Sequence, residues 1–120
     1  MRHIKILKED GSIELQALSD EINKAASQLK YSPSQYFKNL ASSVAIKTSA
    51  LIQSRARAKG IENAVLLMAA AYAGTQSKRS PISVRPFDEG NFLVVDGNST
   101  TSIAIAAGWP DIPCIILEST

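Results

Sequence analysis

A run of small and polar residues at positions 97–101 has the types and the spacing that phosphate binding requires. It follows the apolar run 92–95, which is typical of a buried strand, and it opens the helix-favouring segment 102–107. Free N–H groups at the start of a helix favour an anion, and a glycine lets the backbone approach it closely. The alternative is that a hydroxyl of this run only caps its own helix. The candidate phosphate-binding residues are Gly97, Asn98, Ser99, Thr100 and Thr101.

Asp96 and Arg85 are the candidate catalytic residues. Asp96 ends the predicted strand directly before the turn, where a carboxylate can act as a general base. Arg85 lies in the preceding predicted strand and can stabilise charge on a phosphoryl group. Asp96 can also pair with another carboxylate to hold a metal, but the acidic segment 88–91 is more simply a hairpin turn. The chain has one histidine and one cysteine, so we predict no metal site.

Basic residues gather in two places. Cations at the end of a helix are ordinary dipole compensation, but two groups that meet in space can contact nucleic-acid phosphates without reading sequence. Trp109 can stack on a base, although a tryptophan after a helix-ending glycine more often fills the edge of a core. The candidate nucleic-acid contacts are Arg55, Arg57, Lys59, Lys78 and Arg79, with Arg85 beside the second group.

Composition limits the class of protein. The chain has 120 residues and a net charge of +2, which predicts one domain and is too mild to indicate a nucleic-acid binder by itself. The longest apolar stretch, 64–73, is too short to span a bilayer, and no signal-peptide pattern opens the chain. Cys114, in an apolar run, is expected to be a buried, unreactive thiol. We therefore expect a cytoplasmic protein that does not enter a membrane.

Helical signals dominate the first part of the chain after a predicted hairpin at 4–15. One helix is expected from Ser19 to about residue 30. A second is expected from a capping box at Ser32 to Lys59, with Gly60 as its stop, either unbroken or with a break near 42–43 or 48–49. A third, at 62–73, is apolar nearly all round and ends at Gly74, which indicates a buried helix or a partner interface. We predict an α+β domain with a helix-rich N-terminal half. A helical cover at 19–74 would pack on a small mixed sheet formed within 81–117.

The segment 81–117 resembles the ParB-like N-terminal domain, whose superfamily includes sulfiredoxin. The resemblance lies in Gly97-Asn98-Ser99-Thr100, Ala104, Gly108-Trp109 and Ile112-Pro113, and in the upstream strand Pro81-Ile82-Ser83-Val84-Arg85-Pro86. Relatives usually carry Arg, or His-Arg, where this chain has Ser99 and Thr100. A sulfiredoxin-type reductase would need a cysteine where Asn98 stands.

The resemblance implies a domain that binds nucleotide or nucleic-acid phosphate, with nuclease or nucleotide phosphohydrolase chemistry if the chain is an enzyme. The identity of any cofactor is left open by the sequence. The missing basic pair leaves a second hypothesis open, in which the fold is kept without catalysis. The apolar helices would then bind a protein partner or a second copy of the chain.

Overall fold

The computed structural model describes residues 2–117 and has an α+β fold built on a curled, mixed, five-stranded sheet. The strand order is β3-β7-β5-β6-β4, with β7 parallel to β5, β4 parallel to β6, and the remaining neighbours antiparallel. The strands span Val44–Lys47 (β3), Leu51–Ile52 (β4), Ile82–Pro86 (β5), Phe92–Asp96 (β6) and Asp111–Ile116 (β7). The predicted mixed sheet is confirmed, and it also recruits strands from the first half of the chain.

The β5–β6 hairpin and the β6–α4–β7 crossover form the part of the fold that the sequence predicts. Asn91 donates from its N–H to the Asp88 carbonyl, and Gly90 has the positive φ of a tight turn. Helix α4, Asn98–Ala106, then returns the chain so that β7 lies parallel to β5. Gly108, with φ +78°, follows the helix at the predicted stop.

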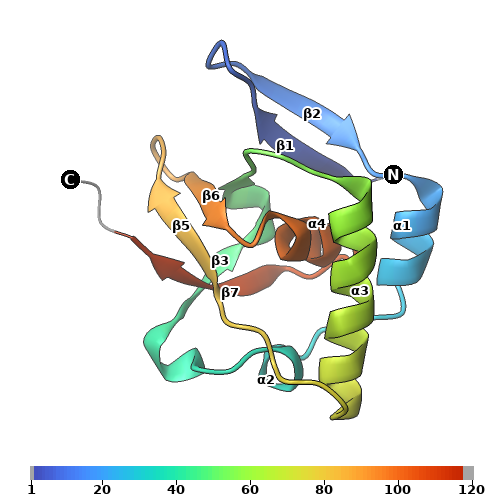
Figure 1. Cartoon of the computed structure of the whole chain (residues 1–120). Helices are drawn as coiled ribbons and strands as arrows, with labels where there is room; N and C mark the ends of the chain where they lie inside the picture. Colours follow the sequence, from blue (N-terminus) through green and yellow to red (C-terminus); the bar gives the residue numbers. More distant parts are fainter. Residues whose placement is uncertain (1, 118–120) are drawn as a thin grey trace.

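Helix α4 lies at the centre of the molecule, between the sheet and two other helices (Figure 1). α1 (Asp20–Ala26) and α3 (Ala58–Ala73) contact α4 on one side, and the sheet contacts it on the other. Almost every residue of α4 is buried, including the polar Thr101 and Ser102. α2 (Pro33–Tyr36) contributes Tyr36 to the same core. The start of α4 is therefore held from several directions at once.

Trp109 is a core residue, which decides between the two interpretations of its sequence position. It is 2% exposed, its indole N–H donates to the Leu29 carbonyl at 3.0 Å, and its ring packs on Tyr36. It therefore presents no face on which a base can stack. The expectation for Cys114 is also met, because the thiol is buried and burial raises its pKa to about 12.

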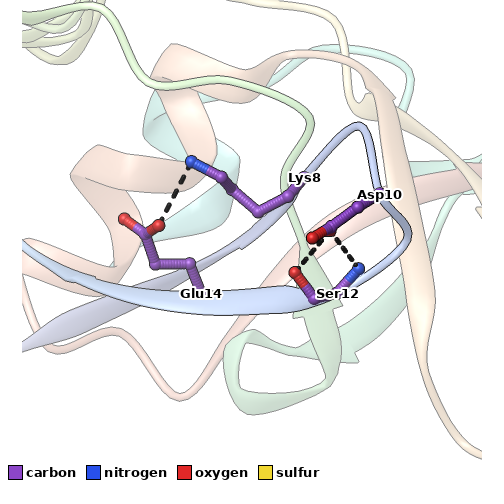
Figure 2. Close-up of polar contacts among 4 residues, drawn as sticks. All are labelled: Lys8, Asp10, Ser12 and Glu14. Atoms are coloured by element: carbon purple, nitrogen blue, oxygen red, sulfur yellow. Dashed lines mark hydrogen bonds and ion pairs between the residues drawn. The ribbon is translucent and has the colours of Figure 1, made fainter.

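The N-terminal hairpin, β1 (His3–Leu7) and β2 (Ile13–Ala17), forms a separate two-stranded sheet. Its turn is closed by Asp10, whose carboxylate accepts hydrogen bonds from the N–H and hydroxyl of Ser12 at 2.9 and 2.6 Å (Figure 2). Those bonds lower the pKa of Asp10, and a 3.2 Å ion pair joins Lys8 to Glu14. β1 continues beside β4 through a parallel bridge between Ile6 and Gln53. The predicted hairpin is confirmed.

The prediction of a helix-rich N-terminal half is wrong. Where one long helix was expected up to Gly60, the chain forms α2, two 3₁₀ turns at Leu40–Ser42 and Thr48–Ala50, and the strands β3 and β4. The helical path already ends at Phe37, which is extended with φ −120° and ψ 144°, and Val44–Lys47 beyond it pairs with β7. Gly60 does not end a helix but lies in the first turn of α3.

Three other helix ends follow their predicted signals, whereas α1 ends at Ala26 rather than near residue 30 and α3 begins at Ala58 rather than at residue 62. Ser19 caps α1 by accepting from the N–H of Ile22 at 3.2 Å, and Gly74 ends α3 with φ +82°. Pro33 opens α2, although Ser32 makes no capping bond there. Across residues 2–117, we find no helix whose length and apolar character would let it cross a membrane.

Candidate phosphate-binding site

Gly97 connects β6 to α4 in a conformation and a space that suit only glycine. Its φ is +102°, and a Cβ there would lie 2.4 Å from Cγ2 of Ile82. α4 begins at the next residue, so the predicted order of strand, turn and helix is confirmed. The close approach to Ile82 means that β5 fixes the position at which α4 starts.

The first turn of α4 carries backbone N–H groups that the helix does not use. The first helical bond runs from the N–H of Thr101 to the Gly97 carbonyl at 2.9 Å, so the three preceding N–H groups have no acceptor within the helix. Within the described residues, that turn has neither a capping side-chain bond nor an acidic residue. The first turn itself therefore supplies no negative charge to compensate the partial positive charge of this helix end, and the nearest carboxylate along the chain is that of Asp96.

A cavity of about 340 Å³ lies on one flank of the turn, and we call it the β5-side cavity. Three cationic side chains border it together with one carboxylate, Asp96. Its floor is the end of β6 and the start of α4. The lining residues are Lys38, Lys78, Arg79, Ser80, Pro81, Ile82, Asp96, Gly97 and Thr100.

Lys38 reaches this cavity because the chain after α2 pairs with the loop before β5. Its N–H donates to the Arg79 carbonyl at 2.9 Å, and the N–H of Arg79 donates to the Tyr36 carbonyl at 2.7 Å. This bridge places a third cation beside Lys78 and Arg79. The sequence analysis missed Lys38 because no local pattern indicates a pairing across forty residues.

A second cavity, of about 210 Å³, lies on the other flank, and we call it the α3-side cavity. Arg55, Arg57, Gly60, Asn98 and Ser99 line it. The first turns of α3 and α4 meet here, since a Cβ on Gly60 would lie 3.0 Å from Oγ of Ser99. In the described part of the chain, the first turn of α3 also lacks an acidic residue and a side-chain cap. Two positive helix ends and two arginines therefore border one small space.

Gln53 ties the arginine segment to the start of α4. It is fully buried, and its Nε2 lies within hydrogen-bond distance of the Asn98 carbonyl (3.0 Å), Oγ of Ser102 (2.8 Å) and the Arg55 carbonyl (3.2 Å). Its Oε1 has no hydrogen-bond partner among the described residues. Sequence reasoning did not identify Gln53. The only available signal was a polar residue directly after two buried aliphatic ones.

The five predicted phosphate ligands divide into two groups in the structure. The Asn98 side chain accepts from the N–H of Ser54 and donates to its hydroxyl, both at 3.1 Å. The Thr101 hydroxyl donates to the Gly97 carbonyl at 2.9 Å. These two side chains hold the fold together, and Asn98 also borders the α3-side cavity, as Ser99 does, whereas Gly97 and Thr100 border the β5-side cavity. Thr101 thus fits the alternative in which a hydroxyl serves its own helix.

The two predicted catalytic residues lie on neighbouring strands at different positions. Asp96 borders the β5-side cavity and pairs with Ser83 across the sheet. Arg85 is two residues further along β5, opposite Leu93. Of the cations predicted for nucleic-acid contact, four border the cavities, and Lys59 is exposed nearby in the first turn of α3.

The site has the donors for an anion but not the ligands for a metal. Over residues 2–117, no group of three His, Cys, Asp or Glu side chains is placed to hold a metal ion. In comparisons with known proteins, no family model matches the chain and no curated protein matches it.

Proposed function

We propose that this chain is a ParB-like domain that binds phosphate groups of a nucleotide or a nucleic acid at the start of α4. The observation that supports this proposal is the gathering of cations on both flanks of one helix N-terminus whose first turn carries no acidic residue. Five of the thirteen basic residues border the two cavities, against one carboxylate, although the net charge of the whole chain is only +2. Such a local excess of positive charge attracts phosphates rather than neutral ligands.

The proposed function is phosphate binding, and any catalysis at this site would depend on that binding. Hydrolysis of a phosphoester at this site would use Asp96 as the general base, with Lys78 and Arg79 on the same cavity to stabilise the phosphoryl charge. Arg85, on the adjacent strand, is the further candidate for that role. A cytoplasmic location, where nucleotides and nucleic acids are present, belongs to the same proposal.

Fluorescence anisotropy of a labelled single-stranded oligonucleotide and of a labelled nucleoside triphosphate tests the proposal. At about 50 mM salt the wild-type chain should bind at least one of these probes, and log Kd should rise linearly with log salt. The double variants Lys78→Gln/Arg79→Gln and Arg55→Gln/Arg57→Gln should each weaken binding and lower the salt slope by about 1 to 2. Absence of binding at low salt refutes the proposal.

A charge-matched control separates a site from general attraction to a basic protein. Lys24 and Lys30 are exposed cations in and just after α1, away from both cavities. The double variant Lys24→Gln/Lys30→Gln removes the same net charge and should change Kd by less than about twofold. If it weakens binding as much as the site variants do, the cavities have no special role.

The second candidate function is a protein-interaction module, and the exposed apolar face of α3 favours it. Leu66 is 70% exposed and Tyr72 is 42% exposed, beside an apolar groove of about 410 Å³ between α1 and α3. Self-association through this face predicts a dimer in sedimentation velocity experiments that Leu66→Gln converts to a monomer. A wild-type chain that stays monomeric at about 100 μM removes the support for a homodimer.

A further inference from the structure

A third cavity lies at the opposite end of α4 from the candidate phosphate site. Its volume is about 330 Å³, and we call it the α4 C-terminal cavity. Since α4 has nine residues, this end is about 13 Å from the phosphate site at 1.5 Å per residue. The residues that line it come from β1 and the residue before it, the turn Thr48–Ala50, β4, the end of α4 and the segment after α4. They are Arg2, His3, Lys5, Thr48, Ser49, Leu51, Ile105 and Trp109.

The lining separates into an apolar part and a basic part. Leu51 and Trp109 are almost fully buried and Ile105 is half-buried, so these side chains form the inner surface. Arg2 and His3 are exposed and Lys5 is half-buried, so the basic groups lie toward solvent. No carboxylate is among the residues that line the cavity. An apolar surface with a few convergent polar groups is the usual composition of a small-molecule site.

The basic groups are held in place by contacts of the fold. Lys5 Nζ donates to the Ser49 carbonyl at 2.7 Å, which uses one of its three N–H groups and leaves two for a ligand. The Arg2 guanidinium lies against Gly108, where an added Cβ would come within 2.6 Å of Nη2. The turn that carries Ser49 is fixed by Thr48, whose hydroxyl donates to the Trp109 carbonyl at 2.8 Å. The cavity is therefore preformed, which reduces the ordering cost of binding.

We propose that the α4 C-terminal cavity binds a small organic anion with an apolar body, of the class of aromatic and branched aliphatic carboxylates. The apolar body packs mainly on Ile105 and on the small parts of Leu51 and Trp109 that reach the cavity, and the carboxylate accepts charge-assisted hydrogen bonds from Lys5 and Arg2. A bare phosphate does not fit this chemistry because it leaves the apolar surface uncovered. This site is independent of the phosphate site and does not rest on the proposed function.

Benzoate, benzamide and inorganic phosphate are the probes that test the proposal with the wild-type chain. Benzamide has the size of benzoate without its charge, and phosphate has charge without an apolar body. In ¹⁵N–¹H NMR titrations, benzoate should saturably shift the amides of Thr48, Ser49 and Ile105 and the single indole N–H, that of Trp109. At those positions benzamide and phosphate should each bind at least about tenfold more weakly.

Variants of Lys5 add a second, independent measurement. Lys5→Met should weaken benzoate binding by about fivefold to tenfold, and Lys5→Arg should stay within about threefold of wild type. Lys24→Met is the control, because Lys24 is exposed on α1 away from the cavity, and it should change nothing. If Lys5→Met does not fold, the three-probe comparison with the wild-type chain still decides the matter.

Three results would overturn the proposal. The first is no saturable benzoate shift at the cavity up to about 20 mM, which corresponds to less than about 2.5 kcal/mol of binding. The second is benzamide binding as tightly as benzoate, and the third is phosphate doing so at the same amides. Phosphate shifts at residues 97–101 report instead on the other end of α4, so the two proposals fail separately.

Discussion

Replacing Gly97 by alanine tests whether β5 fixes the start of α4. Two costs add at this position. A φ of +102° costs an L-residue about 1–2 kcal/mol, and a Cβ placed 2.4 Å from Cγ2 of Ile82 forces an overpacked contact worth about 1–3 kcal/mol. The expected loss is therefore about 2–5 kcal/mol, against a total stability of about 6–18 kcal/mol for 120 residues.

Gly90→Ala is the matched control for this substitution. Gly90 also has a positive φ, +82°, but nothing lies within 4 Å of the Cβ that would be added. It carries only the conformational cost of about 1–2 kcal/mol, so the difference between the two variants isolates the contact with Ile82 at about 1–3 kcal/mol. Adding Ile82→Ala to Gly97→Ala should recover part of that difference as a favourable coupling of about 1–2 kcal/mol.

Urea unfolding followed by the fluorescence of Trp109 measures these differences, because this single tryptophan is buried in the core. With a slope of about 1–3 kcal/mol per molar urea, Gly97→Ala should lower the midpoint by about 1–2 M. Equal losses for Gly97→Ala and Gly90→Ala, within about 0.5 kcal/mol, would refute the reasoning. Ile82 would then move aside at no cost, and the position of α4 would not depend on β5.

Three further perturbations follow from the contacts of the fold. Gln53→Met leaves buried acceptors unpaired and should cost about 2–4 kcal/mol in the same urea assay. Cys114 should resist a thiol reagent in the native state and react only after unfolding, because burial raises its pKa to about 12. Carboxyl NMR should place the pKa of Asp10 below its ordinary value, and Ser12→Ala should raise it. The stability that Asp10 contributes is present above its unfolded pKa and is lost as pH falls through the lower folded value.

The segment from β5 to β7 was predictable because its signals are local. Gly97 and Gly108 adopt the positive φ angles that glycine supplies, and the apolar runs beside them become paired strands. A turn that contains Asp88 and Gly90 between two such apolar runs predicts a hairpin. The role of each of these residues can be predicted from its neighbours a few positions away, so a single sequence is enough to predict the structure of this segment.

The segment 33–60 was not predictable because its structure depends on distant partners. Apolar residues at helical spacing indicated a helix, but Val44 to Lys47 pair with β7 about seventy positions later in the chain. Leu51 and Ile52 pair with β6, and Gln53 bonds to α4. The hydrogen bonds and burial gained in these pairings outweigh a helical preference of a few tenths of a kcal/mol per residue.

The candidate site depends both on local sequence signals and on contacts between distant segments. Its turn is local, but its cations come from segments that the fold brings to the two flanks of α4. Ser99 lies close to Gly60 and Thr100 is 4% exposed, and neither side chain carries a charge. Yet Ser99 borders the cavity that holds Arg55 and Arg57, and Thr100 borders the one that holds Lys38, Lys78 and Arg79. The turn itself therefore carries no cationic side chain, but cationic side chains border the cavity beside Ser99 and the cavity beside Thr100. The proposed binding of phosphate therefore depends on charges that the fold brings together from distant segments, and these charges are not part of the motif along the chain.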